Sequence, residues 1–184
     1  KLLIRLIEMH IKRILPTISY AIGQNNNHGT SEAAALFTGG HFLKSHGLIK
    51  YTISEVIGRK WLEDRAKILF SKDGCFSQYS VNYHRLALDT YSFCESYRKK
   101  NELELFSKKM YDKIKKATFW LEILTDTKNG GAPNIGANDG AKILSMFNSE
   151  YRDYRPSVQW ANLVFNNRVI YDLTENQASI YNQL

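Results

Sequence analysis

The sequence has little cysteine and proline and no long apolar run. Its 184 residues include two cysteines, Cys75 and Cys94, too few for a disulfide scaffold and without the Cys-x-x-Cys spacing of a zinc ribbon. Only three prolines interrupt the chain, so long helices are possible. No apolar run approaches the ~20 residues of a membrane-spanning helix, and no signal peptide is visible. We therefore expect no membrane span.

Acidic residues are outnumbered by basic ones. The chain has 25 Lys and Arg against 18 Asp and Glu, a net charge of +7 and a pI near 9.3. A positive surface favours an anionic partner, such as an acidic polysaccharide, a nucleic acid or a membrane surface, although a simply solvated basic surface is the alternative. The basic residues are spread along several predicted helices without a helix-turn-helix signature, so we expect no nucleic-acid partner.

Apolar residues recur at intervals of three and four, which predicts helices. The expected helices cover residues 1–22, 31–44, a segment from 52, 80–97, 102–124, 141–147 and 156–166. Pro16 should end or kink the first, and Thr52 with Glu55 fits a capping box. The apolar residues of the helix from 52 share one face: Ile53, Val56, Ile57, Trp61 and Ile68. Paired helices without a strand pattern predict an all-α array of helical hairpins.

Three polar segments next to helix ends are candidates for chemistry: residues 25–32, 78–85 and 134–140. Loops at one end of a helical-hairpin array come together and can line one cleft. The chain also starts within an amphipathic pattern and stops without a clear end. We interpret it as a piece of a longer protein.

The first polar segment places asparagines and His28 before a predicted helix. A helix N-terminus favours anions, so the amides and the imidazole could hold a carboxylate; a capped turn is the alternative. His28 and Glu32 lie four residues apart, which allows a metal pair. Because no third ligand is evident, we expect no metal and interpret Glu32 as orienting the imidazole or favouring the first turn.

The second polar segment contains Tyr83, His84 and Arg85 in succession. Tyr83 could transfer a proton if a cation or an amide lowered its pKa. The alternative is a core tyrosine on the same side as the apolar residues that follow it, Leu86, Ala87, Thr90 and Cys94. Arg85 and Asp89, four residues apart, could form a structural ion pair.

Four stretches together resemble the heparinase II/III-like family of polysaccharide lyases, which is related to alginate and oligoalginate lyases. They read NNNHGTSEAAALFTGG, DGCFSQYSVNYHRLALD, GGAPNIGANDGAKIL and DYRPSVQWANLVF, and they occur in family order. The resemblance implies that residues 1–184 are part of an incomplete (α/α) toroid of helical hairpins. It also implies β-elimination at a uronic acid of an acidic polysaccharide or oligosaccharide, without a cofactor in this portion.

The resemblance also implies roles for particular residues. Asn27 and His28 match the positions that hold the substrate carboxylate, and Tyr83 matches the catalytic tyrosine, acting as base, acid or both. His84 and Arg85 would support the site or contact the glycan. Three further residues are expected at the substrate: Glu32, Asn138 and Asp139.

The sequence departs from the family in two ways. The family uses another histidine far downstream, whereas no histidine follows His84, and the β-sandwich that follows the toroid is absent. The chain therefore resembles a fragment that carries part of the site. A non-catalytic toroid that binds acidic glycans, or a protein associated with polysaccharide biosynthesis, is the alternative. A degradative lyase would be periplasmic or secreted, and a cytoplasmic location stays open.

Overall fold

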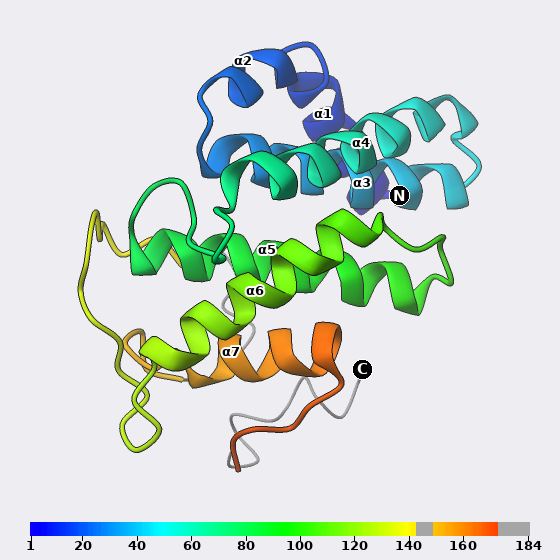
Figure 1. The fold of residues 1–184 in the computed structure, drawn as a ribbon. Coiled ribbons are helices and arrows are strands. Elements are labelled where there is room, and N and C mark those ends of the chain that lie inside the picture. Colours follow the sequence, from blue (N-terminus) through cyan, green and yellow to red (C-terminus); the bar gives the residue numbers. More distant parts are fainter. Residues whose placement is uncertain (143–148, 173–184) are drawn as a thin grey trace. The chain divides into compact units, whose positions relative to one another are not determined.

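A computed structural model describes residues 1–142 and 149–172. Its described part is all-helical, with an isolated antiparallel bridge between Phe70 and Phe76, so the all-α prediction is confirmed (Figure 1). The chain divides into two compact units, Lys1–Leu69 and Phe70–Leu184, which are considered separately below. No helix in the described ranges is both long and apolar enough to cross a membrane.

The first unit contains α1 (Leu2–Ile14), α2 (Ile18–Gly23), α3 (Asn27–Ser45), the 3-10 turn η1 (Ile49–Tyr51) and α4 (Thr52–Leu69). Pro16 lies between α1 and α2, which confirms the expected break. The core of this unit is formed by one cluster of buried side chains: Ile11, Ile18, Ile22, Leu36, Leu43 and Tyr51.

Helices α3 and α4 pack closely along their length because glycines replace side chains at the contact. A Cβ atom added to Gly58 would lie 2.2 Å from the backbone nitrogen of Phe37, and one added to Gly40 would lie 2.5 Å from that of Glu55. The buried face of α4 therefore includes Ser54, Gly58 and Leu62. The prediction that the apolar residues of α4 share one buried face is wrong for Ile53, Val56 and Ile68, because each of these residues is more than half exposed.

One helix start and one helix cap differ from expectation. Helix α3 begins at Asn27 rather than near residue 31, because the Asn26 side chain caps it by accepting a hydrogen bond from the His28 N–H at 2.9 Å. Asn27 and His28 thus lie in its first turn. Helix α4 does begin at Thr52, but without the capping box: the Thr52 hydroxyl donates to the Ile49 carbonyl, and Glu55 pairs with Lys44.

The second unit contains α5 (Val81–Lys100), α6 (Lys108–Leu124), α7 (Arg155–Ala161) and the π-helical turn η2 (Asn162–Asn166). Helix α5 contacts α6, α7 and η2 and is buried over most of its length. The predicted buried face of α6 is confirmed at Met110, Ile114, Ala117 and Leu121.

Helix α6 starts six residues later than predicted. Glu102 has a positive φ of 53°, which ends the preceding helical path, and the Ser107 side chain then caps α6 through the Met110 N–H. Residues 125–140 contain no helix, as expected. Of the helix expected over 141–147, Ala141 and Lys142 are not helical, and the remainder lies outside the described residues.

Candidate functional site

The first turn of α5 is bonded to the loop of residues 134–140. The Ser80 hydroxyl accepts from the Tyr83 N–H at 3.1 Å and donates to the Ala137 carbonyl at 2.6 Å. The Val81 N–H donates to the Ile135 carbonyl at 3.1 Å. Gly136 allows this approach, since its φ is +76° and an added Cβ would lie 2.2 Å from the Tyr79 carbonyl oxygen. The cap that starts α5 thus also positions the loop.

This attachment brings Tyr83 and Asp139 together across 56 residues of sequence. The Tyr83 hydroxyl donates to the Asp139 carboxylate at 2.6 Å. That hydrogen bond, followed by burial, raises the pKa of Tyr83. Hydrogen bonds from Tyr83 and from the Ala141 N–H lower the pKa of Asp139. At neutral pH the pair is therefore a protonated phenol beside an ionised carboxylate.

The protonation state of Tyr83 bears on its expected chemistry. A tyrosine that acts as a base in its resting state needs a lowered pKa, whereas that of Tyr83 is raised. A phenol that keeps its proton suits general acid catalysis. Tyr83 is only half-buried and its hydroxyl reaches a loop carboxylate, so the core-tyrosine alternative does not describe it.

Arg85 lies behind this pair and is 1% exposed. Its guanidinium donates to the Tyr151 carbonyl at 2.6 Å and to the Asn82 side-chain oxygen at 2.8 Å. It also lies over the rings of Tyr151 and Tyr154, at 4.7 and 4.2 Å from their centroids. Of the two roles expected for Arg85, this burial favours support of the site over contact with a glycan.

Asn82 and Tyr151 join the site without having been predicted. The Tyr151 hydroxyl lies 2.9 Å from the Asn82 side-chain oxygen and also contacts that of Asn138. The position of Asn82 next to Tyr83 could have indicated it. Tyr151 had no such signal, because its place depends on the buried Arg85.

The expected ion pair between Arg85 and Asp89 is absent from the described structure. Arg85 is directed to Asn82 and Tyr151 instead. Asp89 is buried and has a hydrogen bond to Ser157, and its other carboxylate oxygen has no partner among the residues that the structure describes. Burial raises the pKa of Asp89 to about 7, although Ser157, Arg85 and Lys142 oppose the rise. A carboxylate held in this way favours its neutral form.

The raised pKa of Asp89 predicts a loss of stability as the pH increases. Above pH 4 the unfolded chain releases this proton, whereas the folded chain retains it until about pH 7. The contribution of Asp89 to the free energy of unfolding should fall across this window by up to about 1.4 kcal/mol per pH unit. In urea denaturation, Asp89→Asn should show a flatter dependence on pH than the parent chain. Parallel curves for the two proteins would contradict the prediction.

His84 is fully buried, at 0% exposure. Its Nε2 lies 2.9 Å from the Ala117 carbonyl oxygen, and its ring stacks on Trp120 at 4.5 Å. Burial lowers its pKa to about 4, so the imidazole is neutral at neutral pH. Of the two roles expected for His84, its burial and its packing against α6 favour support of the site over contact with a glycan.

Asn27, His28 and Glu32 belong to the first unit, in the first two turns of α3. Burial raises the pKa of Glu32, whereas His28 lowers it, and one Glu32 carboxylate oxygen is buried without a hydrogen-bond partner. Within the described ranges, no group of three or more His, Cys, Asp or Glu side chains could hold a metal ion. Tyr83 belongs to the second unit.

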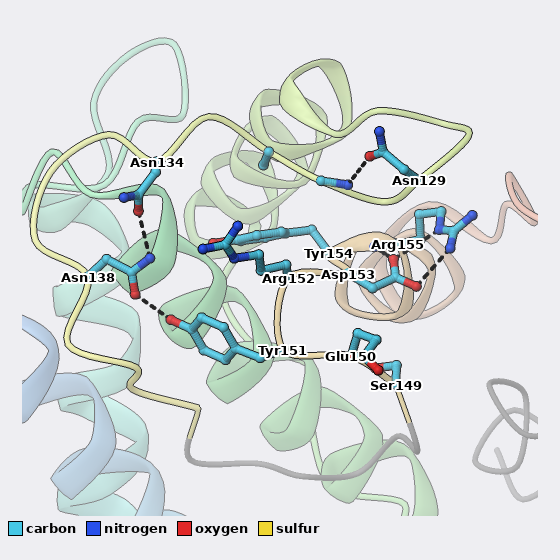
Figure 2. Close-up of a pocket in the computed structure, with 12 residues that line it drawn as sticks. Asn129, Asn134, Asn138, Ser149, Glu150, Tyr151, Arg152, Asp153, Tyr154 and Arg155 are labelled. Atoms are coloured by element: carbon cyan, nitrogen blue, oxygen red, sulfur yellow. Dashed lines mark hydrogen bonds and ion pairs between the residues drawn. The ribbon is translucent and has the colours of Figure 1, made fainter.

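A cleft of about 1290 Å³, the 129–155 cleft, opens beside the loop that carries Asp139. Its walls are residues 129–138 and 149–155 (Figure 2). Asp153 and Arg155 stiffen one wall through paired contacts, both at 2.9 Å. Asn138, which lines the cleft, precedes Asp139 in the chain. Tyr83 and Asp139 themselves do not line it.

Comparisons with known proteins leave the family of the chain unassigned. No protein-family model, no curated protein and no solved structure matches it.

Proposed function

We propose that the chain is part of a lyase that cleaves acidic polysaccharides by β-elimination, with Tyr83 as the proton-transfer residue. The observation that carries the proposal is the 2.6 Å hydrogen bond between Tyr83 and Asp139, in a loop whose residues Asn134 and Asn138 line a polar cleft. The resemblance of four sequence stretches to the heparinase II/III-like lyases supports the reaction class. The all-α architecture is compatible with the (α/α) toroid that we infer for the complete fold.

The reaction has a defined need for a proton donor. A base removes the proton at C5 of the uronic acid, the C4–C5 double bond forms, and the C4–O bond breaks with its electron pair on oxygen. That oxygen then requires a proton. Tyr83 carries one at neutral pH, and the ionised Asp139 orients the phenol by accepting its hydrogen bond. We therefore assign Tyr83 the role of general acid towards the leaving oxygen.

The C5 proton is removable only if the charge that develops beside it is stabilised. A uronate carboxylate takes up this charge as the enolate-like intermediate forms, so hydrogen-bond donors at the carboxylate lower the barrier. Asn27 and His28, at the N-terminus of α3, have the donor chemistry for this role. The assignment of these two residues rests on the resemblance.

The proposal predicts a product with a characteristic absorbance. Mixing the full-length protein that contains this chain with alginate, hyaluronan, heparan sulfate, chondroitin sulfate and polygalacturonate in turn should give an increase in the ultraviolet band of an unsaturated uronate with at least one of them. The control is the same glycans with their carboxyl groups reduced to alcohols, because without the carboxylate the carbanion at C5 is not stabilised. Binding without any increase in absorbance would favour the non-catalytic glycan-binding alternative.

A further inference from the structure

We propose that the 129–155 cleft is a binding subsite for an acidic sugar and that Arg152 contacts the negative group of this sugar. The inference takes its ligand class from the proposed function, but it concerns residues to which the resemblance assigns no role. It rests on three observations: the size of the cleft, an unpaired guanidinium and a surplus of hydrogen-bond donors.

Arg152 is the positively charged group available to a ligand. It is exposed and lines the cleft (Figure 2). Its side chain forms no ion pair or hydrogen bond with any residue that the structure describes. Arg155, in contrast, is held by two hydrogen bonds to Asp153. A guanidinium can bind a carboxylate through two parallel hydrogen bonds, and no described residue occupies that of Arg152.

The asparagines of the cleft add donors suited to sugar hydroxyls. The Asn129 side-chain oxygen accepts from the Gly131 N–H at 2.7 Å, and that of Asn134 accepts from Asn138 at 2.6 Å. These contacts fix the orientation of both side chains. Among the described residues, the NH₂ groups of Asn129 and Asn134 have no partner. The cleft thus presents amide donors together with Arg152, and this set complements a hydroxylated anion.

The wall that carries Arg152 is anchored on both sides. Arg85 holds the Tyr151 carbonyl at 2.6 Å, and Asp153 accepts from the Arg155 N–H at 3.0 Å. The Tyr154 N–H donates to the Gly130 carbonyl at 2.8 Å, which connects the two walls. Such anchoring lowers the entropy lost when a ligand binds. The cleft volume of about 1290 Å³ exceeds the ~300–1,000 Å³ of typical small-molecule sites, which favours an oligosaccharide.

One acidic side chain in the cleft opposes anion binding. Glu150 is exposed and lines the cleft, and its carboxylate has no partner in the described part of the chain. An anionic ligand would be repelled by Glu150 and attracted by Arg152. The two charges therefore predict substitution effects of opposite sign, which a purely structural role of either residue would not produce.

A glycan fits this cleft better than a nucleic acid does. Nucleic-acid sites use several lysines or arginines along the phosphate backbone and aromatic faces on which bases stack. Here, within the described residues, the guanidinium of Arg152 has no partner and is accompanied by amides. Tyr154 is buried, and the Tyr151 ring is covered by Arg85.

Calorimetric titration with oligosaccharides of the five glycans named above tests the subsite. For the glycan that binds, Arg152→Gln should weaken binding about tenfold, since a charge-assisted hydrogen bond is lost. Glu150→Gln should tighten it. Arg5→Gln, which removes the same charge from an exposed position in α1, should leave the affinity unchanged and so controls for net charge.

The outcomes separate the subsite from the catalytic proposal. Weakening by Arg152→Gln without any elimination activity of the full-length protein would support the subsite and overturn the lyase. Elimination with an affinity and KM unaffected by Arg152→Gln would overturn the subsite alone. Binding to none of the five glycans, or tighter binding of single-stranded RNA through Arg152, would also overturn it.

Discussion

Replacement of Tyr83 by Phe should lower the rate of elimination by roughly 10²–10⁴-fold, the contribution typical of a positioned acid or base. The substitution removes only the hydroxyl that donates to Asp139, and the ring keeps its place in the first turn of α5. Glycan affinity should change little, because the leaving oxygen needs the proton only as the bond breaks. Initial rates at saturating glycan, with calorimetric binding in parallel, measure both quantities.

Tyr79→Phe is the matched control for this experiment. Tyr79 is exposed and precedes the Ser80 cap by one residue, so its loss tests for a general effect on the start of α5. We expect activity close to that of the parent chain. If Tyr83→Phe retained near-normal turnover, Tyr83 would have no catalytic role.

The pH profile distinguishes an acid from a structural tyrosine. A general acid loses activity when it ionises at high pH, and Asp139 raises the pKa at which Tyr83 does so. Asp139→Asn removes the charge responsible and should move the alkaline limb of kcat to lower pH. If Asp139→Asn remained active and its kcat fell at the same alkaline pH as that of the parent, the Tyr83 phenol would not supply the proton.

Gly58→Ala should have the largest effect on stability, a loss of about 3 kcal/mol in the free energy of unfolding. The added methyl group would lie 2.2 Å from the Phe37 nitrogen and 2.6 Å from the Ala33 carbonyl oxygen. Both are backbone atoms, so no side-chain rotation relieves the overlap, and α3 and α4 must separate. Urea denaturation followed by helical circular dichroism measures the loss.

Gly23→Ala supplies the control within the same unit. No atom lies within 4 Å of a Cβ built at Gly23. Alanine has the higher helix propensity, so we expect the free energy of unfolding to stay equal or to rise by up to ~1 kcal/mol. If both variants unfolded at the same urea concentration, close approach of α3 and α4 would not explain the need for Gly58.

The sequence predicted helices well where a local signal marks them. Pro16 indicated the division between α1 and α2, and the repeat of Met110, Ile114, Ala117 and Leu121 gave the buried face of α6. The prediction was wrong where tertiary contacts determine which face of a helix is buried. On α4 an apolar pattern indicated one face, but Ser54 and Gly58 form the buried side because α3 approaches too closely for larger side chains.

In the candidate site, too, the residues placed by tertiary contacts could not be predicted from the sequence. Tyr83 and Asp139 lie in polar segments that the sequence marked as candidates and to which the resemblance added roles, and the structure brings them together. Asn82 and Tyr151 were missed because their roles depend on a buried cation, and burial of an arginine cannot be inferred from its neighbours in sequence. For the same reason Arg85 and Asp89 suggested an ion pair that the described structure does not contain.

The Arg85 contacts also constrain the order of events during synthesis. Arg85 is buried only once Tyr151, 66 residues later, reaches it. At ~5–20 residues per second, a ribosome needs several seconds to supply that segment. During this interval α5 keeps a charged surface that its own hairpin with α6 does not cover. We expect the second unit to complete its folding late. Arg85 should stay hydrated until the segment Tyr151–Tyr154, which precedes α7, packs on it.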